Sequence, residues 1–237
     1  MNDITFNFLG RTVIVFGGSK GIGKEICRQF ASAGALVYNA SRTPINQKFV
    51  EDIKCDISDE NQIKETFSRF DNIDFVINVA GTNLCDTIEN ISTEEWDRLM
   101  DVNLKAFFLI CKQSIQLMKR QKYGRIVNVS SIAGRNKSIV SGVHYTSSKY
   151  GVIGLTKQLA NEVSQYNILV NCVCPSQTMT EMLQQSMDNT AISELKSKIP
   201  VRRIATTTEQ AMPVLFLCSS AASYIAGAAI DVNGGQL

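Results

Sequence analysis

The chain has 237 residues, of which 44% are hydrophobic and 19% are charged, and its formal net charge is +2. This length is enough for one α/β domain with a sizeable core, and the composition is ordinary for a globular protein. A net charge so close to zero gives no electrostatic reason to expect a nucleic-acid partner. The sequence has no apolar run near the roughly 20 residues of a membrane-spanning helix, so no membrane partner is expected.

The N-terminus and the cysteines bear on the compartment. Residues 1–10 lack the basic and apolar regions of a secretory signal, so we expect a cytoplasmic protein. Seven cysteines, an odd number scattered over predicted strands and helices, fit a reducing compartment. Cys172 and Cys174 resemble half of a metal site, but they lie on one predicted strand and have no second ligand pair. We therefore interpret them as small buried side chains, and no metal is expected.

Predicted strands and helices alternate along the chain, which is typical of a parallel sheet with helices on both faces. We expect strands at residues 12–16, 36–40, 51–55, 75–78, 125–129, 169–174 and 229–232. Helices are expected from near Ser19 or Lys20 and over residues 59–70, 93–118, 143–165 and 208–218. Ser92 to Glu95 has the capping-box pattern, and Pro213 should kink the last helix or mark a later start.

The connection between the second and third predicted strands is unusually short. Only about ten residues lie between them, and the stretch 41–47 contains a proline and shows no helical period. We expect a loop or a single turn here in place of a helix. One face of the sheet should then be less covered at this edge.

A glycine turn joins the first strand to the first helix, with the sequence Gly17-Gly18-Ser19-Lys20-Gly21-Ile22-Gly23. Such a turn brings backbone N–H groups and a helix N-terminus to one place, which favours an anion such as a dinucleotide pyrophosphate. The spacing differs from the commoner G-x-G-x-x-G, and any tight strand–helix turn can use glycine. The turn therefore indicates dinucleotide binding only together with other motifs.

A second motif is the pair Tyr145 and Lys149, which are four residues apart and so lie on one helical face. Hydride transfer to a carbonyl develops negative charge on oxygen, and a tyrosine beside it can donate a proton. A free tyrosine titrates near pH 10, and we expect the lysine to lower this pKa. On its own such a pair is more often an incidental surface contact, so its meaning depends on the surrounding motifs.

Several motifs follow the glycine turn in order: Cys55-Asp56, Asn78-x-Ala80-Gly81, Asn103, Ser131, Tyr145-x-x-x-Lys149, Pro175 and Asp231-Val232-Asn233-Gly234-Gly235. With these motifs the chain resembles the short-chain dehydrogenase/reductase family over residues 10–235. The resemblance implies one Rossmann-type domain over residues 1–237, with a doubly wound parallel sheet of about seven strands. It also implies an NAD(P)-dependent oxidoreductase acting on C=O or CH–OH groups.

The resemblance assigns four catalytic residues. Tyr145 would be the proton donor, and Lys149 would also bind the nicotinamide ribose. Ser131 would hold and polarise the substrate oxygen, and Asn103 would support a water relay to Lys149.

Two neighbours of these residues, Ser130 and His144, are also candidates for a catalytic role. Ser130 competes with Ser131, but the family pattern ends on the residue before Ile132, which is Ser131. His144, the only histidine, should point about 100° away from Tyr145, so we expect a rim or packing role.

The end of the second strand determines the expected cofactor. An acidic residue there would bind the adenosine ribose and repel a 2′-phosphate, but this chain has Ser41 followed by Arg42. With Lys20 in the glycine turn, two cations favour NADP(H) over NAD(H); the alternative is that both are solvated surface cations. The expected cofactor-binding residues are Gly17, Ser19, Lys20, Gly21, Ile22, Gly23, Ser41, Arg42, Asp56, Ile57, Asn78, Ala80, Gly81, Tyr145, Lys149, Pro175, Thr178 and Thr180.

The leading expectation is an NADPH-dependent reductase that converts a ketone to a secondary alcohol, most like the 3-oxoacyl thioester reductases. One alternative is a dehydrogenase that oxidises a cyclic or polar secondary alcohol. Another is a catalytically idle, cofactor-binding structural or sensor protein. An acyl carrier protein would need a basic patch, which Lys119, Arg120, Lys122 and Arg125 offer in part, although they fit a solvated helix end equally well.

Two surface features are also predicted. Helices 93–118 and 143–165 carry apolar residues on more than one face, and the matching helices of the family form a two-fold interface. In the family the C-terminal strand also pairs across a second axis, so we expect a homotetramer with two perpendicular two-fold interfaces. Residues 180–199 are expected to form an amphipathic lid over the substrate, with an ordinary surface helix pair as the alternative. Its apolar residues are Met182, Leu183, Met187, Ile192 and Leu195.

Overall fold

The computed structural model describes residues 4–138, 140–181, 183 and 188–237. Its centre is a seven-stranded parallel sheet in the order β3-β2-β1-β4-β5-β6-β7. The strands are β1 (Thr12–Phe16), β2 (Leu36–Ser41), β3 (Val50–Lys54), β4 (Phe75–Asn78), β5 (Gly124–Val129), β6 (Ile168–Pro175) and β7 (Ala229–Val232). Every expected strand is confirmed, with ends that differ by no more than one residue.

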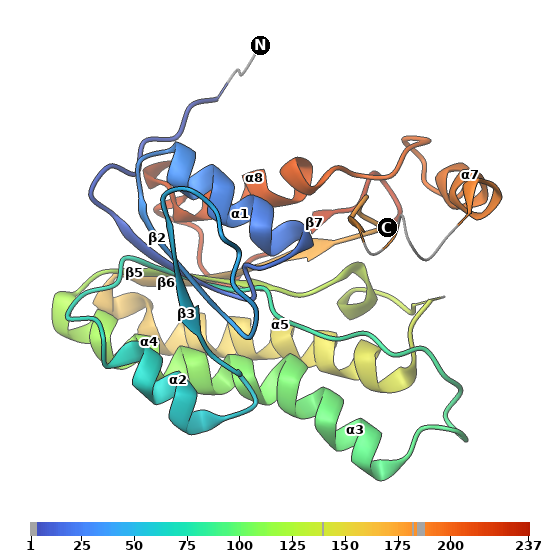
Figure 1. The fold of residues 1–237 in the computed structure, drawn as a ribbon, viewed down its shortest axis with the longest axis horizontal. Helices are drawn as coiled ribbons and strands as arrows, with labels where there is room; N and C mark the ends of the chain where they lie inside the picture. The colour runs from blue at the N-terminus through green and yellow to red at the C-terminus, as the bar shows by residue number, and fades with distance from the viewer. Residues whose placement is uncertain (1–3, 139, 182, 184–187) are drawn as a thin grey trace.

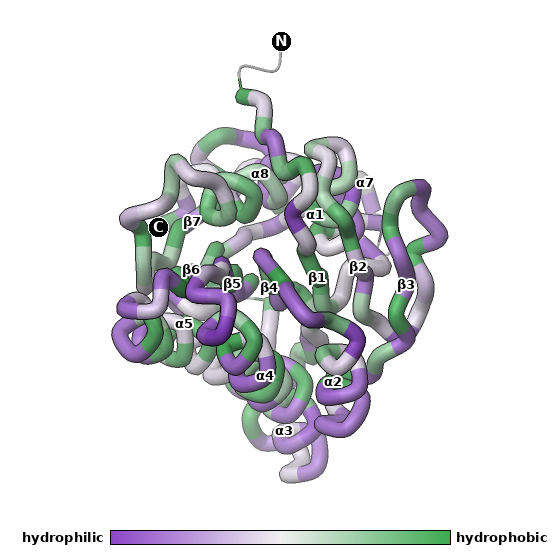
Figure 2. The backbone as a smooth tube through the Cα atoms, turned by 90° about the vertical axis from the view of Figure 1, so that its left-hand side faces the viewer, coloured by the Kyte–Doolittle hydropathy of each residue, from purple (hydrophilic) through white to green (hydrophobic). Residues whose placement is uncertain are grey.

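Helices cover both faces of the sheet (Figure 1). On one face lie α1 (Gly21–Ser32) and α8 (Thr207–Cys218), and on the other lie α2 (Glu60–Phe67), α4 (Ala106–Gln121) and α5 (Val143–Val163). Along α2, α3 (Thr93–Met100) and α4, hydrophilic and hydrophobic residues alternate, as expected for helices with one buried face (Figure 2). The doubly wound α/β fold is therefore confirmed.

The alternation of side chains along β1 divides the core into two layers. Val13 and Val15 pack in the cluster beneath α1 and α8, whereas Ile14 and Phe16 pack in the cluster beneath α2 and α4. The central strands β4, β5 and β6 are buried along their whole length. This is why they are nearly continuous apolar runs in the sequence.

The helix expected over residues 93–118 is interrupted. α3 continues into a π-helical turn at Asp101–Lys105, and only then does α4 begin. Such a turn is often found at functional sites, and this one contains Asn103. At the start of α3, the Ser92 hydroxyl accepts a hydrogen bond from Glu95 N at 3.1 Å, which is one of the two bonds of a capping box.

Other helix boundaries also differ from expectation. α2 ends at Phe67, and α8 runs through Pro213, so this proline does not mark a later start. The complete capping box of the described chain is at Thr206 and Glu209, ahead of α8. Between β2 and β3 no helix is present, as predicted. Among the described residues, no helix has both the length and the apolarity to cross a membrane.

Candidate active site

The predicted site residues gather beyond the carboxyl ends of β1, β4, β5 and β6. In the sheet order, β1 lies between β2 and β4, so the chain winds in opposite directions from this point. Open α/β sheets bind ligands in the crevice outside such a switch point. The fold thus brings together the glycine turn, the segment after β4 and the segment with Ser131, all at the carboxyl ends of the strands.

The glycine turn packs tightly against neighbouring backbone and leaves the N-terminus of α1 at its end. Gly17 has φ +94°, and a Cβ there would lie 2.6 Å from the backbone N of Ala80. A Cβ on Gly23 would lie 2.2 Å from the carbonyl oxygen of Gly17. Lys20 caps α1 without any side-chain hydrogen bond to the helix, so the first N–H groups of α1 face outward unclaimed by a cap. These residues fit a dinucleotide phosphate.

The residues predicted to bind the nicotinamide end of the cofactor, which lie at and after the end of β6, are next to the same turn. Gly21 has φ +52°, and a Cβ there would lie 3.2 Å from Cγ2 of Thr180. Thr178 is buried, and its hydroxyl donates to the carbonyl oxygen of Ser176 at 2.9 Å. Pro175 ends β6. The predicted residues after β6 therefore lie beside the glycine turn, although more than 150 residues separate them in sequence.

Tyr145 and Lys149 lie one turn apart in the first half of α5. Lys149 is 3% exposed, and its Nζ donates a hydrogen bond to the carbonyl oxygen of Val129 at 3.1 Å. The same Nζ lies 5.6 Å from the centre of the Tyr145 ring. The last residue of β5 therefore fixes the lysine beside the tyrosine.

The two adjacent serines after β5 have separate roles in the structure. Ser131 contacts the Tyr145 phenol, and its Oγ also accepts a hydrogen bond from Ala133 N at 3.1 Å. Ser130 is buried, and its hydroxyl donates to the carbonyl oxygen of Lys149 at 2.8 Å. Ser131 therefore faces the tyrosine, whereas Ser130 binds the helix backbone behind the lysine. This arrangement supports the choice of Ser131.

Asn103 ties the π-helical turn to the segment after β4. Its Oδ1 accepts from Thr82 N, and its Nδ2 donates to Thr82 O, both at 2.8 Å. Its Nδ2 also lies 3.4 Å from the hydroxyl of Ser148. A Cβ on Gly81 would lie 3.3 Å from Asn103 Oδ1 and 3.6 Å from Lys149 Nζ. Asn103, Gly81 and Lys149 thus form one wall of the site.

Comparison with known proteins shows which family the chain belongs to. The family model described as Enoyl-(Acyl carrier protein) reductase matches residues 17–236. The 3-oxoacyl-[acyl-carrier-protein] reductase FabG of Aquifex aeolicus is 34% identical over 96% of this chain and 97% of its own. The chain belongs to the short-chain dehydrogenase/reductase family. It is therefore an oxidoreductase.

Two solved structures superpose closely on this chain. The aldohexose dehydrogenase of Thermoplasma acidophilum has a TM-score of 0.90 and 31% identity, covering 98% of this chain and 96% of its own. ElxO with NADP bound has a TM-score of 0.89 and 28% identity, covering 95% of this chain and 98% of its own.

The protonation of this oxidoreductase's site differs from what the sequence predicted. Burial raises the pKa of Tyr145, and the hydrogen bond with Ser131 lowers it only in part, so the pKa stays above its ordinary value. The expectation that Lys149 lowers the pKa of Tyr145 is therefore wrong for this state of the site. Burial lowers the pKa of Lys149 itself to about 8, and its Nζ is hydrogen-bonded to Val129 O.

The predicted adenosine side of the site carries two exposed cations. Lys20 and Arg42 are exposed, and neither is in an ion pair with a described residue. The Ser41 hydroxyl donates to the carbonyl oxygen of Thr43 at 2.6 Å. Asp56 accepts hydrogen bonds from Ser58, which hold its pKa below the ordinary value, and Arg42 adds a smaller effect in the same direction. Ile57 is buried in the core beside it.

Asn78 lies in the core and not at the surface of the crevice. It is fully buried, and its Nδ2 donates to Asn128 Oδ1 at 2.8 Å. Asn128 Nδ2 donates in turn to the hydroxyl of Thr156 on α5 at 2.9 Å. The side chain predicted to bind the cofactor thus links β4, β5 and α5, and supports the site from behind. Sequence reasoning missed this network because Asn128 and Thr156 belong to no motif.

The remaining predicted features of this oxidoreductase lie around the site. His144 is fully buried, and its Nε2 is 3.6 Å from Glu95 Oε1, consistent with a packing role. Among the described residues, no group of three or more His, Cys, Asp or Glu side chains could hold a metal ion.

The basic residues proposed for a carrier protein lie at the amino end of β5, opposite to Ser131. Arg125 is 5% exposed, and its guanidinium donates to the carbonyl oxygens of Gly124 and Asn167. Lys119 Nζ lies 4.5 Å from the centre of the Tyr166 ring. Within one chain, this cluster therefore lies at the opposite end of the strands from the site and does not border it.

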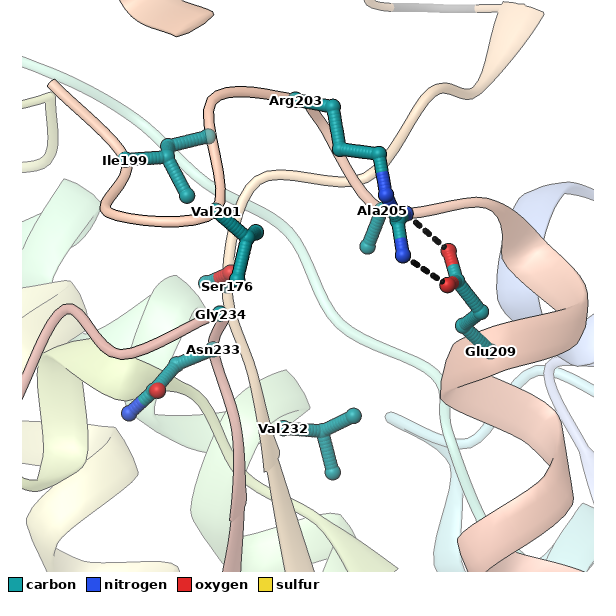
Figure 3. Close-up of a pocket in the computed structure, with 9 residues that line it drawn as sticks. All are labelled: Ser176, Ile199, Val201, Arg203, Ala205, Glu209, Val232, Asn233 and Gly234. Atoms are coloured by element: carbon teal, nitrogen blue, oxygen red, sulfur yellow. Dashed lines mark hydrogen bonds and ion pairs between the residues drawn. The ribbon is translucent and has the colours of Figure 1, made fainter. Parts of the chain in front are cut away.

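The described part of the predicted lid contains α7 (Asn189–Ser197). Leu183, Ile192 and Leu195 pack with Ile199 and Ile204 in a small cluster, while Met182 and Met187 lie outside the described residues. Beyond it, a hollow of about 150 Å³ lies near the ends of β6 and β7 (Figure 3). Its wall carries the ion pair between Arg203 and Glu209, and none of the predicted catalytic residues lines it.

Proposed function

We propose that the chain is an NADPH-dependent reductase that converts a ketone to a secondary alcohol. The observation that carries this proposal is the convergence of Ser131, Tyr145 and Lys149 beside the glycine turn. A proton donor, a hydrogen-bond donor and a buried cation meet there at the crevice where the cofactor would lie. This arrangement also argues against a catalytically idle cofactor-binding protein.

Each of these residues has a chemical part in the proposal. Bound NADPH would supply the hydride. The Ser131 hydroxyl donates a hydrogen bond to the carbonyl oxygen and orients it toward Tyr145. The Tyr145 phenol then gives its proton to the oxygen as negative charge develops. Because the pKa of Tyr145 is raised by burial, the phenol is protonated at neutral pH, as reduction requires.

Lys149 and Asn103 have supporting parts. The ammonium group of Lys149, held by its hydrogen bond to the carbonyl oxygen of Val129, binds the nicotinamide ribose. Asn103 holds the segment after β4 through both hydrogen bonds to Thr82 and supports a water relay to Lys149. The predicted NADP(H) site is completed by the outward-facing N–H groups of α1.

The preference for NADPH is inferred from charge. Ser41 stands where a carboxylate would repel a 2′-phosphate, and the exposed Arg42 and Lys20 have no ion-pair partner among the described residues. Charge-assisted hydrogen bonds to a phosphate are stronger than neutral ones. The similarity to ElxO, whose structure has NADP bound, supports the same choice.

Two substrate classes have support from relatives. The similarity to a 3-oxoacyl-[acyl-carrier-protein] reductase favours a 3-oxoacyl thioester. The similarity to an aldohexose dehydrogenase favours oxidation of a polar secondary alcohol as the second candidate. Because the basic cluster lies on the far edge of the sheet, we favour a small-molecule thioester over a carrier-protein conjugate.

A substrate panel tests this proposal. The purified protein is assayed with acetoacetyl-coenzyme A, a 3-oxoacyl carrier-protein conjugate, cyclic ketones and aldoses, each with both nicotinamide cofactors in the appropriate redox state. We expect turnover of a thioester ketone with NADPH, and a rate lower by about 10²- to 10⁴-fold in the Tyr145→Phe control. Turnover of aldoses alone would favour the dehydrogenase, and binding of cofactor without any turnover would favour the idle protein.

A further inference from the structure

The loop between β2 and β3 is ordered without a helix. Residues 42–49 are held by one buried side chain and by a charged residue of β3. Ile45 is 8% exposed and packs into the cluster beneath α1. Asn46 and Phe49 have positive φ values of 50° and 64°, so the loop includes two unfavourable backbone positions that need support.

Asp52 supports the loop at Ile45 and Asn46 and joins it to β2, through three hydrogen bonds. Its Oδ1 accepts from Asn39 Nδ2 at 2.7 Å and from Ile45 N at 2.9 Å. Its Oδ2 accepts from Asn46 N at 3.1 Å. Asn39 is the residue directly opposite Asp52 in the β2–β3 register, and it is 1% exposed. One carboxylate thus joins the second strand, the third strand and the middle of the loop.

The carboxylate is charged in this position. Burial alone raises the pKa of Asp52, but the hydrogen bonds from Ile45, Asn39 and Asn46 outweigh this effect, so the pKa lies below its ordinary value. Charge-assisted hydrogen bonds are about twice as strong as neutral ones. The three bonds therefore restrain the loop more firmly than an uncharged side chain would.

Arg42 lies between two fixed points of this loop. On one side, β2 ends at Ser41, whose hydroxyl binds Thr43 O. On the other side, Asp52 holds Ile45 and Asn46. Arg42 also lies near enough to Asp56 to help lower the pKa of that carboxyl group.

We propose that Asp52 is a positioning residue for NADPH selection, which fixes the loop that carries Arg42 at the adenosine 2′-phosphate. This inference rests on the proposed function. A flexible loop would lose conformational entropy when it closes on the cofactor, and a loop ordered beforehand does not. The hydrogen bonds of Asp52 thus order the β2–β3 loop, which has no helix to order it.

Cofactor binding to Asp52→Ala tests the proposal, with Glu51→Ala as the matched control. Glu51 is the neighbouring exposed carboxylate of β3. Titration calorimetry with NADP⁺ and NAD⁺ measures binding without turnover. We expect Asp52→Ala to raise the Kd for NADP⁺ by about tenfold and that for NAD⁺ by about twofold or less, with kcat at saturating NADPH nearly unchanged. Glu51→Ala should change neither Kd.

The double variant Arg42→Ala/Asp52→Ala separates positioning from general destabilisation. If Asp52 acts through Arg42, the second substitution should not lower the NADP⁺/NAD⁺ preference below that of Arg42→Ala. Two outcomes would overturn the proposal. One is that Asp52→Ala raises the Kd values for NADP⁺ and NAD⁺ by the same factor. The other is that the double variant has a lower NADP⁺/NAD⁺ preference than Arg42→Ala alone. If Arg42→Ala itself leaves the preference unchanged, Arg42 does not contact the 2′-phosphate, and the positioning role of Asp52 fails with it; the NADPH assignment fails only if Lys20→Ala also leaves the preference unchanged. An Arg42→Ala effect with no Asp52→Ala effect overturns the positioning role alone.

Loop order is read directly in the protein without added nucleotide. Trypsin cleavage after Arg42 and Lys48 should be faster in Asp52→Ala than in Glu51→Ala. If Asp52→Ala does not fold, Asp52→Asn replaces it in every arm, because the amide keeps the volume and one acceptor oxygen. Cleavage of the folded Asp52 variant at the Glu51→Ala rate would contradict the proposal.

Discussion

Lys149 Nζ lies 5.6 Å from the centre of the Tyr145 ring, and its hydrogen bond goes to Val129 O at 3.1 Å. The lysine therefore lies beside the tyrosine ring, and no carboxylate of the described residues forms an ion pair with it. Burial lowers its pKa to about 8. The pKa of Tyr145 is raised by the same burial. The two groups meet at neutral pH as a protonated phenol and a destabilised ammonium group, which is the pair that the proposed ketone reduction would use.

The first prediction concerns Tyr145. In the Tyr145→Phe variant, we expect NADPH to bind with a Kd within about twofold of the wild type, because only the proton donor is removed. Turnover of a ketone should fall by about 10²- to 10⁴-fold. Titration calorimetry and steady-state rates with the same preparation measure both quantities. A kcat like that of the wild type would refute the assigned role.

The second prediction concerns the cost of burying Lys149. Its pKa is about 8 in the folded chain and 10.5 in the reference state, so between these values the unfolded chain binds more protons. Stability therefore rises with pH in this window, and the full penalty of about 3 kcal/mol applies below pH 8. Lys149→Met removes this penalty but also removes the hydrogen bond to Val129 O, which is worth about 1 kcal/mol.

We therefore expect Lys149→Met to be more stable than the wild type by about 2 kcal/mol at pH 7, while its turnover is lost. The advantage should shrink as the pH rises from 8 toward 10.5. Urea unfolding of both proteins at several pH values measures the difference, and groups that titrate alike in both cancel. A stability difference that does not change with pH would contradict the depressed lysine pKa.

The sequence predicted the strands well because central parallel strands are buried on both faces. β4, β5 and β6 are therefore nearly continuous apolar runs, and their ends follow from burial alone. The π-helical turn could not be predicted, because the residues 93–121 keep one helical pattern across it. Its position is associated with the tertiary contact between Asn103 and Thr82, which are far apart in sequence.

Within the site, sequence order predicted which residues converge, but it could not say where each side chain points. Ser130 and Ser131 are adjacent and chemically equal, and only the structure separates the support for the Lys149 backbone from the contact with Tyr145. Asn78 was placed at the cofactor, yet its partner is Asn128 on the neighbouring strand. Strand pairing creates such contacts, and no local motif records them.

The third prediction concerns the two exposed cations. Lys20→Ala and Arg42→Ala should each raise the KM for NADPH by about five- to tenfold, because each removes a charge-assisted contact to the 2′-phosphate. The KM for NADH should change by about twofold or less. Replacement of Lys24, an exposed lysine of α1, is the matched control and should change neither value. An unchanged NADPH/NADH ratio in both variants would mean that Lys20 and Arg42 are solvated surface charges.

The last prediction concerns assembly through α4 and α5. Phe108 on α4 and Tyr150 on α5 are 47% and 49% exposed, although both are large and apolar. Gly154 follows Tyr150 by one turn, and a Cβ there would have no neighbour within 4 Å. An exposed apolar stripe interrupted by a glycine suits the close approach of the same helix from another copy, as the homotetramer prediction requires.

In Gly154→Arg, the new side chain would project into this approach while leaving the fold of one chain intact, since glycine is a poor helix former and arginine a good one. We expect the wild type to have a tetramer mass by light scattering at micromolar concentration, and Gly154→Arg to have a smaller mass with an unchanged circular dichroism spectrum. Leu9→Glu, at an exposed apolar residue away from both helices, should keep the wild-type mass. A monomeric wild type, or a Gly154→Arg variant that is still tetrameric, would exclude this face as the interface.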